Sequence, residues 1–317
     1  MLLATTIEDG AVWTAAALAD FERAAVDLDV RTRQAEPLRR HTSFGVGGPC
    51  PLMAFPERPE QVISLAQWAG QRSLRCRALG GGSNLLVRDE GVPEPVINTT
   101  RLTAGTTTHP DHVTFAAGLP TAQALHRTVE AGLSGLVWAA GLPGTLGGAA
   151  AGNAGCWGGD MATSTNYLDV IDGEGQAHRV QGVDLAWAYR ELKLPATIAE
   201  PWCIVAISIQ VESDNPATLR VDYEQLQARK RALQPIGVRN SGCIFRNPEG
   251  GAAGAILDAA GCKGQQVGGA VVSSQHANFI VNDGDATAAD IETLIAQLVA
   301  TAREHQDVVL EPEIRRW

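Results

Sequence analysis

The segment Gly80-Gly81-Gly82-Ser83-Asn84-Leu85-Leu86 begins with three consecutive glycines and continues into a hydroxyl and an amide side chain. Residues without a Cβ let the backbone approach an anion closely, and successive N–H groups in such a turn converge on it. The strand-like residues Arg77-Ala78-Leu79 come directly before it. We therefore interpret this loop as part of a cradle for a diphosphate. A nucleotide-binding fold is expected mainly because of this loop.

Two further segments have the same composition: His41-Thr42-Ser43-Phe44-Gly45-Val46-Gly47-Gly48, and Gly141-Leu142-Pro143-Gly144-Thr145-Leu146-Gly147-Gly148, which continues to Asn153-Ala154-Gly155. One such loop alone is usually only a turn, but three of them in one unit favour a nucleotide site. The residues that we expect at a bound cofactor are Thr42, Ser43, Gly45, Gly47, Gly80, Gly81, Gly82, Ser83, Asn84, Leu85, Pro143, Gly144, Thr145, Gly147, Gly148, Asn153 and Gly155.

The two commonest nucleotide-binding patterns do not fit these loops. No G-x-G-x-x-G joins a strand to a helix with an acidic residue about twenty positions on. No Lys-Ser or Lys-Thr follows a suitable glycine, so a P-loop is excluded as well. The cradle belongs to another nucleotide-binding fold.

Outside the loops, short helices alternate with short strands, which indicates α+β domains. We expect helices over residues 12–27, after Pro59, from a capping Thr121 to Gly132, over 252–260 and over 286–304. We expect strands at 77–79, 113–116, 167–171, 204–211 and 278–282. The predicted domains are a lead-in over residues 1–36, a cofactor domain over 37–212 with subdomains of about 37–100 and 101–212, and a substrate domain over 213–317.

The formal net charge of −10 disfavours binding to nucleic acid or to an anionic membrane surface. The uncharged stretch between Glu130 and Asp160 contains ten glycines and Pro143, so we interpret it as loops rather than a membrane span. The first nine residues lack the basic start of a signal peptide. Six scattered cysteines without a CxxC pair predict a cytoplasmic protein with reduced thiols and no metal site.

Three further sequence motifs follow the three glycine-rich loops along the chain. They are Ala188-Tyr189-Arg190, Ser241-Gly242-Cys243-Ile244-Phe245-Arg246-Asn247-Pro248, and Leu310-Glu311-Pro312-Glu313-Ile314-Arg315. Together with the three loops they closely resemble the UDP-N-acetylenolpyruvoylglucosamine reductases (MurB), from about residue 37 to the C-terminus. Each motif is weak by itself, whereas the ordered set is specific.

The resemblance implies an FAD domain of the vanillyl-alcohol-oxidase (PCMH) type, made of two α+β subdomains, and a C-terminal substrate domain. It implies non-covalent FAD, NADPH as the hydride donor, and Ile207 as a further residue at the cofactor. The implied reaction converts UDP-N-acetylglucosamine enolpyruvate to UDP-N-acetylmuramate, a peptidoglycan precursor. A monomer acting on a small UDP-sugar is the expected state.

Three residues carry the chemistry that the resemblance implies. Arg190 supplies a planar cation that holds a carboxylate in two places and stabilises the charge of an enol intermediate. Glu313 matches the glutamate of the family, and beside an anionic intermediate we expect it to be protonated or to act through hydrogen bonds. Cys243 stands where the family commonly has serine as the proton donor, and a thiol remains largely protonated at neutral pH.

Substrate contacts are expected from Tyr189, Lys230, Arg246 and Asn247, with the two cations opposing the negative charge of the substrate. The other five cysteines are assigned to packing: Cys50, Cys76, Cys156, Cys203 and Cys262. Arg239 is one of several basic residues of the C-terminal third that could oppose the substrate's diphosphate, and a solvated surface position is the alternative interpretation. His276 is interpreted as a structural hydrogen-bonding residue.

The sequence departs from the family pattern at several positions. Glu191-Leu192 replaces a small polar pair, and Val137-Trp138 replaces a pair that commonly contains an acid. The spacing from Arg190 to Cys243 is 243 − 190 = 53 residues, which predicts the subtype without an additional tyrosine-bearing loop. Two alternatives stay open: another FAD-dependent oxidoreductase on the same scaffold, and a non-catalytic nucleotide-sugar-binding protein.

Overall fold

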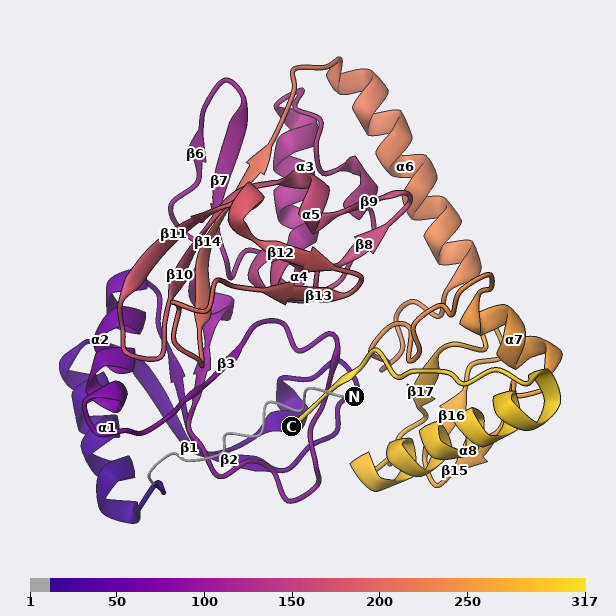
Figure 1. Cartoon of the computed structure of the whole chain (residues 1–317), viewed down its shortest axis with the longest axis horizontal. Helices are drawn as coiled ribbons and strands as arrows, with labels where there is room; N and C mark the ends of the chain where they lie inside the picture. Colours follow the sequence, from indigo (N-terminus) through magenta and orange to yellow (C-terminus); the bar gives the residue numbers. More distant parts are fainter. Residues whose placement is uncertain (1–11) are drawn as a thin grey trace.

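The fold was analysed on a computed structural model, which describes residues 12–317. The segment in which we expect no signal peptide lies outside the described residues. Three groups of elements follow one another along the chain, and Figure 1 shows them as the indigo, the magenta and the orange-to-yellow parts. In the described residues, no helix is long and apolar enough to cross a membrane.

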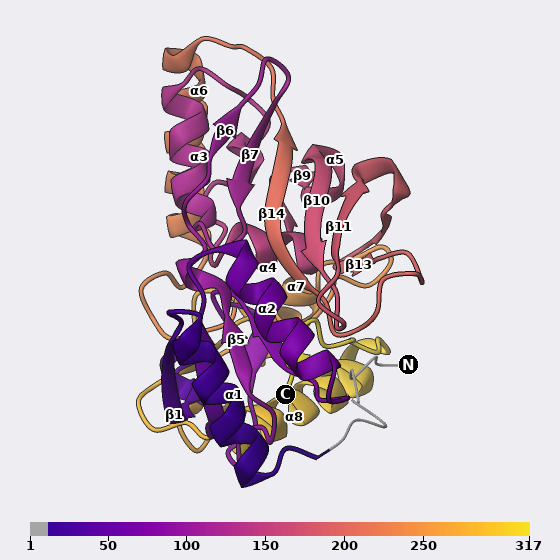
Figure 2. The ribbon, with the colours of Figure 1, turned by 90° about the vertical axis from the view of Figure 1, so that its left-hand side faces the viewer.

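The first group is a four-stranded sheet with the order β1-β2-β5-β3, in which β1 and β2 are antiparallel and the other pairs are parallel. Helices α1 and α2 lie together beside this sheet (Figure 2). Helix α1 begins after Thr14, whose hydroxyl accepts a hydrogen bond from the Ala17 N–H, and it buries Phe21 completely. The bounds are α1 Ala15–Asp27, β1 Arg31–Pro37, β2 Pro49–Phe55, α2 Pro59–Gly70, β3 Arg77–Leu79, β4 Leu85–Leu86 and β5 Val96–Asn98.

The second group is a five-stranded antiparallel sheet with the order β11-β10-β14-β7-β6. Its central strand β14 carries Cys203-Ile204-Val205-Ala206-Ile207-Ser208-Ile209-Gln210 and is buried on both faces, which explains the nearly continuous apolar run. The bounds are β6 Thr107–Thr108, β7 His112–Ala116, α3 Thr121–Glu130, α4 Leu146–Ala151, β8 Gly155–Cys156, β9 Gly159–Asp160, α5 Met161–Ser164, β10 Thr165–Ile171, β11 Ala177–Gln181, β12 Ala186–Ala188, β13 Glu191–Lys193 and β14 Cys203–Gln210.

The third group packs α7 and α8 against a three-stranded antiparallel sheet, β15-β16-β17. Helix α8 begins with a capping box between Thr287 and Asp290, and its buried residues recur every three or four positions. Helix α6 connects this group to the second one. The bounds are α6 Pro216–Leu233, α7 Ala253–Ala259, β15 Gln266–Val267, β16 Ala270–Val272, β17 Ile280–Asn282, α8 Ala288–Gln306 and β18 Arg315–Arg316.

The C-terminus returns to the first group. Strand β18 pairs in parallel with β4, and the Arg315 N–H donates to the Asn84 carbonyl at 3.1 Å. Asp89 accepts hydrogen bonds from the Ala288 and Ala289 N–H groups at the start of α8. These contacts hold the C-terminal motif next to the loop that follows β3.

Most of the expected elements are present with bounds shifted by one or two residues, and three details differ. Thr121 is the first residue of α3 rather than its cap, and its hydroxyl donates to the Gly144 carbonyl. A short helix, α4, lies inside the third glycine-rich segment. The 18-residue helix α6 was not predicted; it is mostly exposed, so its sequence has little apolar periodicity.

Candidate active site

The three glycine-rich loops meet in the structure. The Ser43 N–H donates to the Gly82 carbonyl at 3.0 Å, and a Cβ on Gly82 would collide with the His41 carbonyl oxygen. A Cβ on Gly81 would lie 2.8 Å from the Gly144 Cα, which joins the second loop to the third. The absence of side chains therefore permits the loops to pack backbone against backbone.

The second loop retains free hydrogen-bonding groups. Among the described residues, the N–H groups of Gly81, Gly82 and Ser83 donate to no protein acceptor. The Asn84 Oδ1 atom is buried and also has no partner, while its Nδ2 donates to the Glu313 carbonyl at 3.3 Å. Buried polar groups without partners are rare in native proteins and commonly mark a missing ligand. This donor set fits the diphosphate of a dinucleotide such as FAD.

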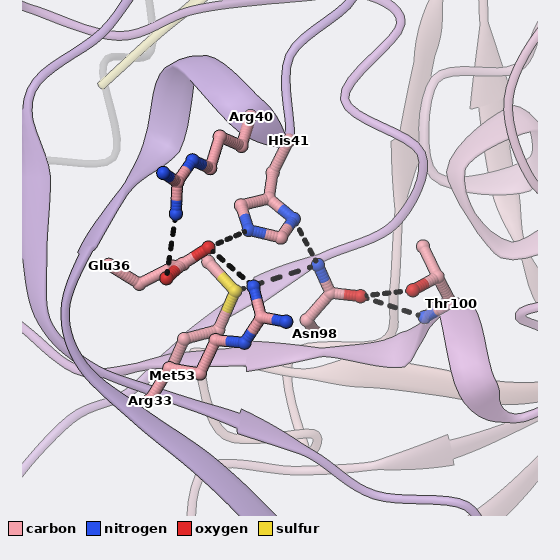
Figure 3. A network of polar contacts seen from close by, with 7 residues as sticks. All are labelled: Arg33, Glu36, Arg40, His41, Met53, Asn98 and Thr100. Carbon is pink, nitrogen blue, oxygen red and sulfur yellow. Dashed lines mark hydrogen bonds and ion pairs between the residues drawn. The ribbon is translucent and has the colours of Figure 1, made fainter.

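A buried polar network anchors the first loop, and Figure 3 shows its side chains. The Glu36 carboxylate, 5% exposed, contacts His41 Nε2 at 2.9 Å and Arg33 Nη1 at 3.0 Å. Asn98 lies against the other ring nitrogen of His41, at 3.5 Å. His41 immediately precedes Thr42, so the network fixes the start of the loop.

Several residues expected at the cofactor use their side chains within the protein. The Thr42 hydroxyl donates to the Val46 carbonyl, and Thr145 Oγ1 accepts from the Gly148 N–H as the cap of α4. Asn153 bonds to Ala188 and Ala162. These side chains shape the loops. The remaining expected positions lie on the same loops or next to them: Ser43, Gly45, Gly47, Gly80, Leu85, Pro143, Gly147 and Gly155.

The expectation for Ile207 is corrected by the structure. Its exposed fraction is 0%, and its side chain packs in the core of the second group. A residue without accessible surface cannot contact a ligand unless the sheet around it moves. Ile207 is therefore a packing residue in this structure.

Arg190 and Glu313 form a buried ion pair, although they are 123 positions apart in the sequence. Arg190 Nε donates to Glu313 Oε1 at 2.8 Å, and the two side chains are 23% and 13% exposed. Arg190 Nη2 donates to the Gly155 carbonyl at 3.0 Å, so the third loop orients the guanidinium. Arg190 has φ = 60°, a left-handed conformation that is rare for a residue with a side chain.

Burial raises the pKa of the Glu313 carboxyl above its ordinary value, although Arg190 and Arg246 act in the opposite direction. The Glu313 N–H donates to the Ile244 carbonyl at 2.7 Å, which places Glu313 next to the Cys243 segment. Burial also raises the pKa of the Cys243 thiol to about 11; the negative charge of Glu313 adds to this, and the positive charges of Arg190 and Lys230 oppose it. A protonated thiol, a carboxyl group with a raised pKa and a guanidinium therefore gather in one place.

Three of the four expected substrate residues, Tyr189, Lys230 and Arg246, lie near this group. Tyr189 is half-exposed, and the Arg190 guanidinium lies 5.0 Å from the centre of its ring. Arg246 acts electrostatically on Glu313. Asn247 Oδ1 accepts from the Ala253 N–H at 3.0 Å, at the start of α7. Lys230 is buried in the last turn of α6, with an exposed fraction of 8%.

Three residues near the site were not predicted as part of it. Cys156 follows Gly155 and lies within electrostatic reach of Lys230 and Arg190. Arg239 packs on the first loop, with its Cδ 3.0 Å from where a Cβ on Gly45 would lie. Arg315 Nη2 donates to the Ala151 carbonyl at 2.5 Å. The adjacency of Cys156 to the third loop was the one signal for it in the sequence.

The structure shows the surroundings of the residues that depart from the family pattern. Leu192 is buried in the core of the second group. Glu191 faces Lys193 at 3.3 Å and acts electrostatically on Arg315. Trp138 Nε1 donates to Ser164 Oγ at 2.8 Å and its ring packs on Gly159. Across residues 12–317, no three His, Cys, Asp or Glu side chains form a group that could hold a metal ion.

Comparisons with known proteins agree with this geometry. A model of an FAD binding domain matches residues 50–181, and a model of the UDP-N-acetylenolpyruvoylglucosamine reductase C-terminal domain matches residues 234–317. The cradle and the matched FAD domain place the chain among FAD-dependent oxidoreductases. The expected α+β fold is confirmed.

Relatives narrow this class to one family. UDP-N-acetylenolpyruvoylglucosamine reductase 2 of Symbiobacterium thermophilum is 37% identical, over 90% of this chain and 92% of its own length. The reductase of Synechococcus sp. (strain WH7803) is 39% identical, over 90% and 92%. The crystal structure of MurB from Thermus caldophilus superposes with a TM-score of 0.76 at 32% identity, over 91% of this chain and 98% of that one. The chain belongs to the UDP-N-acetylenolpyruvoylglucosamine reductase family.

Proposed function

We propose that this chain reduces UDP-N-acetylglucosamine enolpyruvate to UDP-N-acetylmuramate, with NADPH as the hydride donor and FAD as the carrier, in the synthesis of peptidoglycan precursors. The family membership supports this reaction. The observation that carries the proposal is the buried Arg190–Glu313 pair beside Cys243. The hydrogen bond from Asn84 to the Glu313 carbonyl holds Glu313 next to the second glycine-rich loop, which is proposed to bind the cofactor.

The loops would hold FAD, which would supply the hydride-transfer chemistry. The free N–H groups of Gly81, Gly82 and Ser83, together with Asn84, would hold the FAD diphosphate. Bound FAD would take a hydride from NADPH and pass it to the vinyl carbon of the substrate. We propose that FAD is bound non-covalently, without a link to a cysteine or histidine side chain.

Arg190 orients and stabilises the enolpyruvyl group. A guanidinium has five N–H donors, and Arg190 uses three of them for Glu313, Gly155 and Asn153. The other two are available to the substrate carboxylate. Because the guanidinium is fixed before the substrate arrives, it stabilises the enolate charge without reorganising during the reaction.

Glu313 and Cys243 hold the protons. Burial raises the pKa of Glu313, and beside the enolate we expect this carboxyl group to be protonated and to donate a hydrogen bond to the enolate oxygen instead of repelling it. Cys243, with a pKa of about 11, keeps its proton at neutral pH and delivers it to the carbon next to the carboxylate. The thiol therefore performs the role that serine has in the family pattern.

Tyr189, Lys230, Arg246 and Asn247 are proposed to bind the substrate. Tyr189 offers an exposed ring at the edge of the site, and Arg246 offers a cation next to Glu313. Lys230 is buried, so it meets the reacting end of the substrate rather than the solvent-facing end. We also propose the domain division at residues 37–212 and 213–317, a cytoplasmic location and a monomeric state. Sizing chromatography of the purified protein tests the last of these.

Two observable steps test the function. Under anaerobic conditions NADPH should bleach the flavin, and the enolpyruvyl UDP-sugar should then restore its absorbance. Another oxidoreductase of the same fold would pass the first step and fail the second. A non-catalytic nucleotide-sugar-binding protein would bind the sugar but show no steady-state oxidation of NADPH.

A further inference from the structure

The first glycine-rich loop is anchored in a distant part of the fold. The loop lies between β1 and β2 of the first group. Phe44 is completely buried and Val46 is 3% exposed, yet both side chains pack in the hydrophobic core of the third group, with Ile244, Phe245 and Leu257. The apolar side chains of this loop therefore depend for their burial on elements that come much later in the chain.

A buried amide of the third group holds the backbone of the same loop. Asn282 is the last residue of β17, in the orange part of Figure 1. It is 7% exposed, and its Nδ2 donates to the Phe44 carbonyl at 2.8 Å. Its Oδ1 accepts from the N–H groups of Gly284 and Ala286, both at 3.1 Å. Because these N–H groups require the oxygen on their side, the amide is oriented with Nδ2 toward the loop.

Arg239 contacts both Asn282 and the loop. Its carbonyl accepts from the Asn282 N–H at 2.9 Å, and its Cδ would lie 3.0 Å from a Cβ on Gly45. Gly45 has φ = 69°, so a side chain there would be strained as well as crowded. Two separate segments from the C-terminal third of the chain, at residues 239 and 282, thus hold adjacent positions of the loop.

The loop also has hydrogen-bonding groups that the protein leaves free. Among the described residues, the N–H groups of Phe44, Val46 and Gly47 donate to no protein acceptor. The Ser43 N–H donates to the Gly82 carbonyl, which joins these groups to the free N–H groups of the second loop. Several N–H groups bind an anion only while they point toward it together. A loop that is held in place before the ligand arrives avoids the ordering cost during binding.

We propose that Asn282 is a positioning residue for the cofactor: its amide holds the first glycine-rich loop in the conformation that binds FAD. Asn282 acts through the carbonyl of Phe44 and needs no contact with FAD. The affinity for FAD therefore depends on the third group as well as on the two groups that carry the loops. This inference rests on the proposed function, in which FAD binds at these loops.

Asn282→Asp tests the amide donor by itself. The carboxylate can still accept from Gly284 and Ala286, so the turn after β17 keeps its hydrogen bonds, whereas the Phe44 carbonyl loses its donor and faces a negative oxygen. Upon dilution of the full-length FAD-loaded protein, the variant should release FAD about tenfold faster than the wild type does. The rise of free-flavin fluorescence measures this rate, and titration with FAD should show a dissociation constant raised by a similar factor.

Asn278→Asp is the matched control. Asn278 is 2% exposed, and its Nδ2 donates to the Phe245 carbonyl at 2.9 Å, so this amide bonds within the third group. The control loses an equivalent buried donor and should lose stability to a similar degree, but it should release FAD at the wild-type rate. Equal acceleration in both variants, or none in Asn282→Asp, would show that Asn282 only stabilises the fold and would overturn the proposal.

Failure of the proposed function gives a different result, because the release of FAD is measured without the UDP-sugar. If the sugar does not restore the absorbance of wild-type reduced flavin, the proposed reaction is wrong and the effect of Asn282 on FAD release is unaffected. Thermal unfolding of each variant with FAD bound shows whether it is folded. If Asn282→Asp does not fold, Asn282→Ser carries the measurement, since a hydroxyl can still accept from the turn but has no amide N–H for the Phe44 carbonyl.

Discussion

Two buried carboxylates of this protein have opposite properties. Glu36 and Glu313 are 5% and 13% exposed, and each contacts an arginine at 3.0 Å or less. Burial opposes the ionisation of Glu36, but hydrogen bonds from His41 and Arg33 outweigh it and lower the pKa of Glu36. For Glu313 burial prevails, and the pKa is raised.

The two carboxylates also differ in the number of donors that each receives. Three basic side chains face Glu36: Arg33, His41 and, at 3.9 Å, Arg40. Glu313 receives a hydrogen bond from one arginine, which also donates to two backbone carbonyls. A fully paired carboxylate stabilises the fold, whereas an incompletely paired one keeps hydrogen-bonding capacity for a ligand. The comparison predicts that substitutions at the Glu313 site reduce activity, whereas substitution of Glu36 reduces stability.

The largest effect is expected for Cys243→Ala, at the incompletely paired site. NADPH should still reduce FAD, but reoxidation of the flavin by substrate should slow by roughly 10²–10⁴-fold, the usual range for general acid catalysis. Stopped-flow absorbance separates the two half-reactions. Cys243→Ser should retain substantial activity, because a hydroxyl can also donate a proton. Reoxidation at the wild-type rate in the alanine variant would remove Cys243 from the mechanism.

Arg190→Lys should slow the same step by roughly 10²-fold, since a point charge cannot reproduce the planar fork that contacts Glu313 and Gly155 together. Arg231→Lys on α6 is the control and should be neutral. Rapid kinetics at saturating substrate measures the effect. Near-normal turnover would show that the site needs only a positive charge at position 190.

Glu313→Gln should cost about tenfold in reoxidation rate, because an amide N–H still donates a hydrogen bond but less strongly than a carboxylic acid. In the wild type the rate should fall as pH rises through the raised pKa of Glu313, since the protonated form is lost. The variant does not titrate, so this limb of the pH profile should disappear. A limb that persists unchanged would assign it to another group.

Glu36→Gln should act on stability and leave kcat nearly unchanged. We expect a loss of about 2 kcal/mol in the free energy of unfolding, at the low end for a broken buried pair because Arg33 and Arg40 are 45% and 61% exposed. The lowered pKa gives stability that is present above the unfolded pKa and lost as pH falls through the folded one. The difference from wild type should therefore vanish in acid.

Chemical denaturation of the FAD-loaded protein at several pH values measures this difference. Glu249→Gln, in an exposed loop, is the matched control and should change stability by less than about 0.5 kcal/mol. A kcat loss in Glu36→Gln as large as that in Glu313→Gln would contradict the separation between the two carboxylates.

Much of the fold could be predicted from local sequence. The alternation in residues 113–116 and the apolar run at 204–211 mark strands, and the spacing of Ile291, Leu294 and Leu298 marks α8. These signals depend on neighbours a few residues apart. Helix α6 was not predicted because most of its surface faces solvent. Helix α4 was not predicted because it contains Gly147 and Gly148, and Gly147 packs closely against Ala117.

By itself, the sequence determined which residue types were available: three loops without side chains at their turns, one arginine, one thiol and one terminal glutamate, in the order of a known family. Tertiary structure decided how they are paired. It joined Arg190 to Glu313 across 123 positions, brought Lys230 within electrostatic reach of Cys156 and Cys243, and buried Ile207 in the core. The reason is that proton affinity and charge pairing depend on distance and burial, which only the folded chain fixes.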